Sequence, residues 1–143
     1  MSENPVRHAV AGDLDALEAL EGAAFADPWT RAQIAGELAE RHALVLVSHG
    51  LEGYAVFRHI AGEAELLRLA VAPPARRRGL ARRLVEHGLD ILRAAGCAGC
   101  YLEVRTTNGP AIALYEALDY RRAGLRRKYY ADGTDALIMH RPV

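Results

Sequence analysis

The motif Arg-Arg-Arg-Gly-Leu-Ala, residues 76–81, follows a strand-like run at residues 65–71 and opens a strongly amphipathic helix that begins near Leu80. A strand that leads through a glycine-containing loop into a helix often binds anions. The first N–H groups of the helix lack partners there, and the macrodipole adds positive potential. Gly79 allows the backbone to approach a ligand closely, and the neighbouring arginines can donate charge-assisted hydrogen bonds to phosphate. The segment therefore predicts a cofactor that carries phosphate or pyrophosphate.

The spacing of the glycine separates this motif from two common nucleotide-binding motifs. It is not Gly-x-Gly-x-x-Gly, and it lacks the Lys-Ser/Thr of a P-loop. It matches Gln/Arg-x-x-Gly-x-Gly/Ala through Arg76, Gly79 and Ala81. In this it resembles the loop that holds the coenzyme A pyrophosphate in the GNAT superfamily of acetyl-CoA-dependent N-acetyltransferases. The alternative is an ordinary solvated basic loop in front of a helix.

Further motifs extend the resemblance over nearly the whole chain. They resemble the ribosomal-protein-alanine N-acetyltransferase (RimI) type within the superfamily, most specifically from Glu63 to Met139. The motifs are Asp27-Pro28-Trp29, Tyr101-Leu102-Glu103-Val104-Arg105, Thr106-Thr107-Asn108, Ala111-x-x-x-Tyr115-x-x-Leu118, Arg127-Lys128-Tyr129-Tyr130 and Asp135-Ala136-Leu137-Ile138-Met139. The order of strands and helices indicates an α/β fold with a mixed sheet. The resemblance implies a single GNAT-like domain with a mostly antiparallel seven-stranded sheet, splayed at its centre, and about four helices.

Length and composition indicate one domain covering residues 1–143. The chain has 143 residues, which suits one hydrophobic core and is short for two. The formal net charge is zero, so we expect no general attraction to nucleic acid or to an anionic membrane. We find no apolar signal segment and no apolar run of membrane-spanning length, which predicts a cytoplasmic protein. We expect a monomer or a weak homo-oligomer.

Cys97 and Cys100 have a Cys-x-x-Cys spacing that is compatible with a redox pair. Gly96 and Gly99 indicate instead a helix end followed by a strand, in which both cysteines are small apolar residues. The chain has no second cysteine pair and its six histidines lack zinc-type spacing, so no metal is predicted.

Hydrophobic periodicity and capping residues predict the individual elements. Asp13 is expected to cap a helix with Leu14, Leu17 and Leu20 on one face, and Thr30 begins a capping box with Gln33. The last two strands are expected to form a hairpin around a turn at residues 132–133. The expected strands are residues 6–10, 43–48, 54–60, 65–71, 100–105, 125–130 and 136–141, and the later helices begin at Leu80 and Pro110.

Acetyl transfer from a thioester to an amine needs a base, donors for the oxyanion and a proton for the leaving thiolate. The match to the RimI type implies that Glu103 is the general base, on a strand whose Leu102 and Val104 point to the other face. A surface glutamate paired with Arg105 or another arginine is the alternative. The same match implies that Tyr115 is the general acid, whereas a core aromatic with its hydroxyl at the surface is the alternative.

The resemblance also implies which residues bind the two substrates. Main-chain N–H groups near a bulge in the fourth strand would bind the thioester and pantetheine, and the basic loop and helix start would bind the pyrophosphate. Asn108 would hydrogen-bond the cofactor, unless it is a plain turn residue, and Trp29 could equally be buried core. The predicted cofactor-binding residues are Leu69, Ala70, Val71, Arg76, Arg77, Arg78, Gly79, Leu80, Ala81, Arg82 and Asn108. The predicted acceptor-binding residues are Trp29, Arg68, Tyr129 and Tyr130.

Three positions depart from the family pattern. Ala72 replaces an acidic residue, Asp119-Tyr120 replaces Gly-Phe, and Arg68 replaces a small polar residue beside the catalytic strand. The loss of the glycine at position 119 could change how the helix that begins at Pro110 ends. Arg68 bears on peptide specificity more than on acetyl transfer itself.

The ordinary pKa values of amines favour a protein N-terminus as the acceptor. An α-amine titrates at about 7.7–8.0 and lysine at about 10.4, so a neutral lysine at pH 7 costs about 3.3 kcal/mol more. The resemblance to the RimI type implies that the acceptor is the N-terminal alanine of a small-subunit ribosomal protein, with a small amine, a polyamine or a lysine as alternative acceptors. Glu103 and Tyr115 argue against a non-catalytic acyl-CoA-binding domain. The arginines lack the interleaved aromatic residues of an RNA-binding surface.

Overall fold

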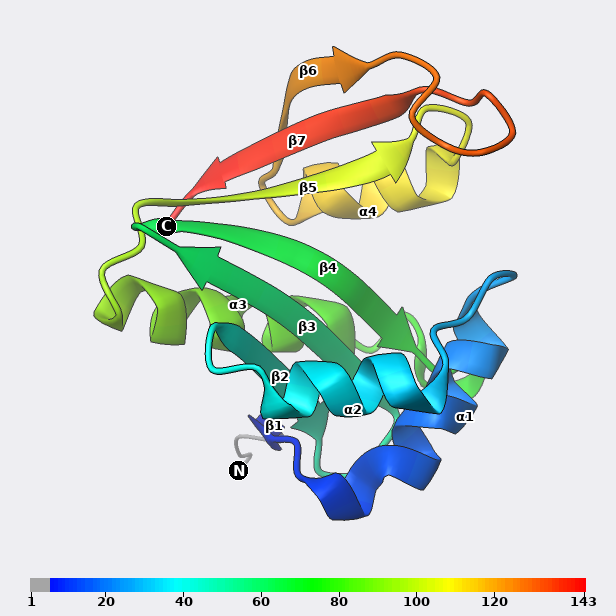
Figure 1. Ribbon diagram of the computed structural model, residues 1–143, viewed down its shortest axis with the longest axis vertical. Helices are drawn as coiled ribbons and strands as arrows, with labels where there is room; N and C mark the ends of the chain where they lie inside the picture. The colour runs from blue at the N-terminus through cyan, green and yellow to red at the C-terminus, as the bar shows by residue number, and fades with distance from the viewer. Residues whose placement is uncertain (1–5) are drawn as a thin grey trace.

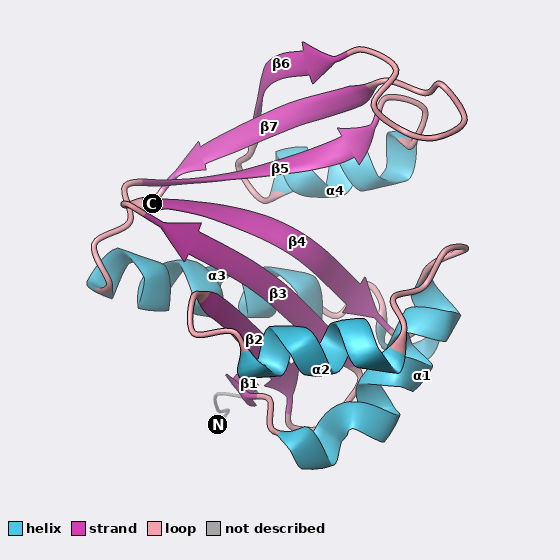
Figure 2. Cartoon of the chain, viewed as in Figure 1, coloured by secondary structure: helices cyan, strands magenta, loops and turns pink. Residues whose placement is uncertain are grey.

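The computed structural model describes residues 6–143, which form a seven-stranded sheet with helices on both faces (Figure 2). The strands are β1 (Val6–His8), β2 (Ala43–Ser48), β3 (Gly53–Ile60), β4 (Glu63–Val71), β5 (Gly99–Arg105), β6 (Arg121–Arg126) and β7 (Ala136–Pro142). The helices are α1 (Leu14–Ala24), α2 (Arg31–Ala39), α3 (Leu80–Ala94) and α4 (Gly109–Ala117), with short 3-10 turns at Ala11–Asp13 and Pro73–Ala75. The strand order is β1-β2-β3-β4-β5-β7-β6. The predicted α/β fold with a seven-stranded mixed sheet is confirmed.

The strands β4 and β5 form the parallel pair of this otherwise antiparallel sheet, and they separate soon after they meet. Their ladder ends at Glu65 and Tyr101, whereas β4 continues to Val71 and β5 to Arg105. Figure 1 shows the two strands diverging from their shared end. The sheet is therefore splayed at its centre, as predicted. We call the region beyond Glu65 and Tyr101 the splay.

A bulge in β4 accompanies this divergence. Val56 of β3 pairs with Arg68, and the next residue, Phe57, pairs with Leu66, so Leu67 is the extra residue in β4. A bulge bends a strand and increases its local twist. Because it follows the last residue of β4 that pairs with β5, it turns β4 away from β5 where the two strands part.

Two hydrophobic cores lie on opposite faces of the sheet. Alternate residues of β2 enter different cores: Leu44 and Leu46 pack with α3, whereas Val45 and Val47 pack with α1 and α2. This alternation follows from the two-residue period of a strand. Helix α4 packs on the same side as α3, through Ile112.

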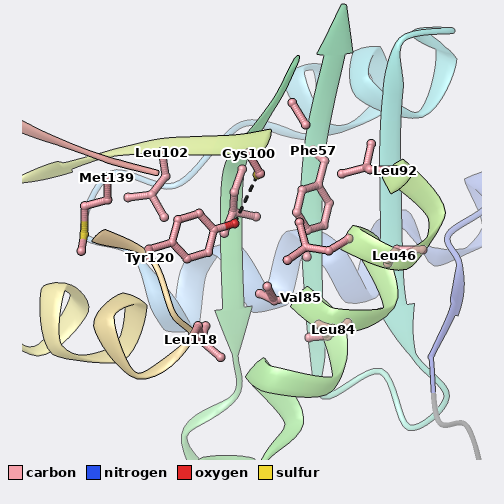
Figure 3. Close-up of a cluster of buried hydrophobic side chains, with 14 of the residues drawn as sticks. Leu46, Phe57, Leu84, Val85, Leu92, Cys100, Leu102, Leu118, Tyr120 and Met139 are labelled. Atoms are coloured by element: carbon pink, nitrogen blue, oxygen red, sulfur yellow. Dashed lines mark hydrogen bonds between the residues drawn. The ribbon is translucent and has the colours of Figure 1, made fainter. Parts of the chain in front are cut away.

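The larger core brings α3 very close to the sheet (Figure 3). A Cβ atom at Gly88 would lie 2.4 Å from Cε1 of Phe57, so only glycine permits this approach. Near α4, the hydroxyl of Tyr120 donates a hydrogen bond to Sγ of Cys100 at 3.2 Å. Asp119, which replaces the family's glycine just after α4, has a left-handed backbone conformation with φ of 70°. Asp adopts that region more readily than most residues, so it can replace the family's glycine there.

Several elements that were predicted from local sequence motifs are confirmed. Thr30 accepts a hydrogen bond from the backbone N–H of Gln33 and forms the predicted capping box of α2. Strand β2 has the predicted bounds, and Gly96 follows α3 with φ of 94°. Both cysteines are free and buried, and burial raises the pKa of Cys100 to about 12, opposite to the shift of a redox thiol.

Two predictions near the N-terminus were wrong in detail. Strand β1 ends at His8 instead of Val10. Asp13 does not cap α1 with its side chain, because its carboxylate accepts hydrogen bonds from Val10 N–H and from Arg7. That carboxylate stabilises the preceding 3-10 turn and ties it to β1.

The position of the penultimate strand was also wrong. The hairpin partner of β7 is residues 121–126, four residues earlier in the chain than predicted. Lys128 has a positive φ of 51°, and its N–H donates to the carboxylate of Asp135 at 2.8 Å. Residues 127–135 therefore form a closed loop, and the aromatic pattern that resembled a strand belongs to this loop.

Candidate active site

The predicted pyrophosphate loop has the backbone geometry of an anion site. Gly79 precedes α3 in the left-handed region with φ of 77°, and Arg77 also has a positive φ of 65°. The N–H groups of Leu80, Ala81 and Arg82 open α3 and have no carbonyl one turn earlier to donate to. Gly79 has no side chain that could cap them. The helix macrodipole adds positive potential at the same point.

Several arginine side chains of this loop make contacts within the protein. Nε of Arg76 donates to the carbonyl of Val71 at 2.9 Å, and Arg78 pairs with Glu52 at 3.2 Å. Arg82 donates to the carbonyl of Ala117 at the end of α4. These contacts brace the loop against β4, the turn between β2 and β3, and α4. The backbone N–H groups are therefore the main candidates for binding the diphosphate.

Replacing Gly79 with valine is expected to weaken acetyl-CoA binding by about tenfold or more. Space is not the reason, because a Cβ atom there would meet Nη1 of Arg83 at an ordinary 3.5 Å. The reason is backbone strain of roughly 1–2 kcal/mol in the left-handed region, which the loop would relieve by changing its conformation. Isothermal titration calorimetry with acetyl-CoA measures the effect.

Gly96→Val is the matched control for this substitution. Gly96 has a similar φ of 94° at the other end of α3, far along the helix from the loop. It should cost comparable stability and leave the dissociation constant for acetyl-CoA unchanged. Equal affinities for the Gly79 and Gly96 variants would count against the loop as the diphosphate site.

The predicted pantetheine segment lies along β4. Leu69, Ala70 and Val71 pair with β3 on one side, and they lie beyond the last pairing of β4 with β5 on the other. The bulge residue is Leu67, just before this segment. Asn108 caps α4, because its Oδ1 accepts a hydrogen bond from the N–H of Ala111 at 3.2 Å. That contact occupies the side-chain oxygen and leaves the side-chain amide as its donor toward a cofactor.

Glu103 lies on β5 beyond the end of the parallel ladder. Leu102 and Val104 are buried on the opposite face, as predicted. The Glu103 carboxylate forms an ion pair with Arg126, as the alternative of a glutamate paired with an arginine expects, and the Glu103 side chain is 14% exposed. Hydrogen bonding to Glu103 raises the pKa of the Tyr129 hydroxyl.

A second carboxylate, Glu65 of β4, lies beside Glu103. Burial raises the pKa of Glu65, and the negative charge of Glu103 raises it further. Burial raises the pKa of the Tyr101 hydroxyl, and interaction with Glu65 raises it further, so these groups form one electrostatic cluster where the strands part. The sequence analysis missed Glu65. A charged residue between two buried apolar residues of the strand, Ala64 and Leu66, is the signal that could have indicated it.

Tyr115 lies on α4 and packs against the larger core. Burial raises the pKa of its hydroxyl to about 12, and the positive charge of Arg68 opposes that rise. Electrostatic interaction with Tyr130 also raises the pKa of Tyr115, and burial and the negative charge of Glu103 raise the pKa of Tyr130. The fold therefore gathers residues from β4, β5, α4 and the loop after β6 at the splay.

The predicted acceptor residues divide into two groups. Tyr129 and Tyr130 pack edge to face in the loop after β6, with ring centroids 5.1 Å apart, and the guanidinium of Arg105 lies 4.1 Å from the Tyr130 ring centroid. Trp29 and Arg68 lie together on the other side of the splay, with the guanidinium 4.8 Å from the Trp29 ring centroid.

The sequence analysis missed two residues that hold this second group. Glu21 and Tyr54 are fully buried, and the carboxylate of Glu21 binds both Arg68 and the hydroxyl of Tyr54. Glu21 follows Leu17 by four residues and so lies on the buried face of α1. An acidic residue at an apolar position of a helix was the available signal.

Residues 14–120 match the Acetyltransferase (GNAT) family. The chain belongs to the GNAT acetyltransferase family. Ribosomal protein bS18-alanine N-acetyltransferase of Escherichia coli strain K12 is 40% identical over 136 residues, which cover 92% of each chain. N-alpha-acetyltransferase RimI of Mycobacterium tuberculosis is 38% identical over 123 residues, 80% of this chain and 76% of the relative. The crystal structure of ribosomal-protein-S18-alanine N-acetyltransferase from E. coli has a TM-score of 0.83 at 38% identity, covering 96% of this chain and 92% of that one.

Membership of the GNAT family confirms the predicted enzyme class. The protein is an acetyl-CoA-dependent N-acetyltransferase, and its similarity to the RimI type is confirmed. Within residues 6–143, no three or more His, Cys, Asp or Glu side chains are grouped to hold a metal ion. None of the helices in that range is both long and apolar enough to cross a membrane.

Proposed function

We propose that this GNAT protein acetylates the N-terminal α-amine of ribosomal protein bS18, at an N-terminal alanine, with Glu103 as general base and Tyr115 as general acid. The observation that carries the proposal is the position of Glu103 on β5 beyond its last pairing with β4, and both Glu103 and Tyr115 interact electrostatically with the loop residue Tyr130. The similarity to the E. coli enzyme named for bS18 alanine supports the acceptor. Such an acceptor implies a cytoplasmic enzyme.

The start of α3 and the edge of β4 fit the two ends of the donor. The N–H groups of Leu80, Ala81 and Arg82 suit a diphosphate, because all three point out of the N-terminus of α3. The edge of β4 from Leu69 to Val71 faces the splay and offers main-chain groups to the pantetheine arm. When bound, acetyl-CoA supplies the activated acyl group as a thioester.

Glu103 would accept the proton that the acceptor ammonium must lose before its nitrogen can attack. Its position on β5, beyond the ladder with β4, places the carboxylate at the opening between the strands. Arg126 holds the carboxylate in place through its ion pair. The transfer proceeds directly or through one water molecule.

Tyr115 would donate its hydroxyl proton to the departing thiolate. The hydroxyl is fully protonated at neutral pH because its pKa lies at about 12. A thiolate with the ordinary pKa of Cys, about 8.5, is a weaker base than the phenolate of Tyr115, so proton transfer from Tyr115 to the thiolate is uphill by about three pKa units. Proton donation from Tyr115 to the thiolate therefore depends on nearby positive charge. Arg68 supplies such charge, which opposes the rise that burial causes in the pKa of Tyr115.

The acceptor peptide would enter between the two aromatic groups. Trp29 stands on the side of α1 and α2, and Tyr129 and Tyr130 stand on the side of β6 and β7. Aromatic rings provide rigid apolar walls with polar edges, which suit an extended backbone with a small first side chain. Alanine is such a residue.

A peptide panel tests the proposal by the release of free thiol from acetyl-CoA. A peptide with the N-terminus of bS18 should be the best acceptor, ahead of the same peptide starting with Ser or Met. The matched control is that peptide with its α-amine formylated and a lysine added inside. If the control peptide or a polyamine released thiol as fast as the unblocked bS18 peptide, the acceptor would be a lysine or a polyamine and not the N-terminal α-amine. No release with any amine would indicate an acyl-CoA-binding protein.

A further inference from the structure

Glu21 is a fully buried carboxylate that the proposed acetyl transfer does not use. It lies on α1, and its oxygens accept hydrogen bonds from groups on three other segments. The hydroxyl of Tyr54 and Nε of Arg68 donate to Oε2, the latter at 3.1 Å. Nη2 of Arg68 donates to Oε1 at 2.6 Å, and the backbone N–H of Trp29 donates to Oε1 at 2.8 Å. A buried charge is tolerated only when it is paired in this way.

Arg68 joins β4 to the segment between α1 and α2, which covers residues 25–29. Its guanidinium lies 3.9 Å from the ring centroid of Phe25 and 4.8 Å from that of Trp29. Nη2 also donates to the carbonyl of Asp27 at 3.4 Å. The side chain is 17% exposed, and its residue follows the bulge residue Leu67 at the edge of the splay.

These contacts determine the conformation of residues 25–29. Three of the five residues in the segment touch Arg68, and Trp29 is held by Glu21 as well. The segment has no regular secondary structure of its own, so its position depends on such contacts. A buried ion pair adds little net stability compared with an apolar pair of similar size. Positional specificity is therefore the property that this pair can supply.

We propose that Glu21 and Arg68 form a positioning pair that holds residues 25–29 against β4 and thereby places Trp29 for the acceptor peptide. The inference rests on the proposed function, because it assigns the Trp29 side of the splay to the acceptor. Arg68 then acts through Trp29. Its Nε and Nη2 already donate to Glu21, and its guanidinium lies 3.9 Å from the ring centroid of Phe25.

The double variant Glu21→Gln/Arg68→Gln tests the pair without leaving a buried charge unpaired. Glutamine at position 21 can still accept from the N–H of Trp29 with its oxygen and can donate from its amide to the hydroxyl oxygen of Tyr54, whereas glutamine at position 68 is too short to reach both rings. We expect the KM for the acceptor peptide to rise by about tenfold, from the lost cation–π and hydrogen-bond contacts. The KM for acetyl-CoA should stay within about twofold, because the α3 loop is unchanged.

Trp29 provides a second readout that does not depend on turnover. It is the single tryptophan of the chain, so protein fluorescence reports this segment alone. In the double variant its emission should shift to longer wavelength and its quenching by acrylamide should increase. A role limited to global stability would lower the urea midpoint without changing quenching of the folded protein.

The pair formed by Glu37 and Arg58 is the matched control. Arg58 donates from Nε at 2.9 Å and from Nη2 at 2.8 Å to Glu37, and it joins α2 to β3 without touching residues 25–29. Glu37→Gln/Arg58→Gln should leave the peptide KM and Trp29 quenching unchanged.

The outcomes separate this inference from the proposed function. If the wild-type enzyme acetylates no peptide N-terminus, the proposed acceptor is wrong, while quenching still tests whether the pair holds the segment. If wild-type activity is present and the Glu21/Arg68 variant keeps its peptide KM and its quenching, the positioning role is wrong. Equal changes in both double variants would also overturn it.

Discussion

Replacing Glu103 with glutamine is expected to lower kcat by about 10²–10⁴-fold, the usual contribution of a general base. Glutamine preserves the size of the side chain and a hydrogen-bond acceptor, but it cannot take a proton from the acceptor ammonium. The dissociation constant for acetyl-CoA should not change, because Glu103 lies on β5 and the predicted diphosphate site lies at the start of α3. Steady-state thiol release and calorimetry measure the two quantities.

Glu65→Gln is the control that this structure supplies for Glu103. Glu65 is a neighbouring carboxylate of the same cluster, its pKa is raised, and it lies at the last pairing of β4 with β5. The control should keep kcat within about tenfold of wild type. A large loss in Glu65→Gln with little loss in Glu103→Gln would assign the base to the other strand.

Replacing Tyr115 with phenylalanine is expected to lower kcat by about 10²-fold or more, because the thiolate would then leave without a proton from the enzyme. The substitution removes a single hydroxyl and keeps the ring that packs on Tyr120 at a centroid distance of 6.2 Å. The pKa of Tyr115 is raised to about 12, so the proton is present below that pH and is lost only above it. The wild-type rate should therefore show no alkaline fall below about pH 11, a measurement made with thiol release at saturating substrates.

Tyr120→Phe is the corresponding control for Tyr115. Tyr120 is also on the α4 side and buried, but its hydroxyl binds Cys100 in the core. It should lose some stability and keep kcat. If Tyr115→Phe retained the wild-type rate, Tyr115 would return to its alternative role as a core aromatic.

Short-range signals in the sequence were sufficient for much of the fold. The capping box at Thr30 and Gln33, the amphipathic helix α3 and the glycine after it depend on residues within a few positions of one another. Strand β2 is buried on both faces and reads as a continuous apolar run. Backbone conformation at such places follows from local sterics and hydrogen bonding, which the sequence expresses directly.

Contacts between distant segments decided the rest. The loop 127–135 contains strand-like aromatic residues, yet the register of β7 places its partner at residues 121–126. Asp13 has the sequence of a helix cap, yet Arg7 on the neighbouring strand binds its carboxylate. In each case the hydrogen bonds come from a segment that the local sequence does not identify. The local preference, for a strand in one case and a helix cap in the other, is therefore overridden.

The candidate site divides in the same way. The sequence by itself determined the α/β order, and it predicted the diphosphate loop, Glu103 and Tyr115, because each belongs to a short motif with a definite spacing. Only the tertiary structure decided that Glu103 meets Arg126 and Glu65, and that Glu21 binds Arg68 forty-seven residues later in the chain. The physical reason is that burial and charge pairing arise when segments pack together, and neither is a property of any one segment.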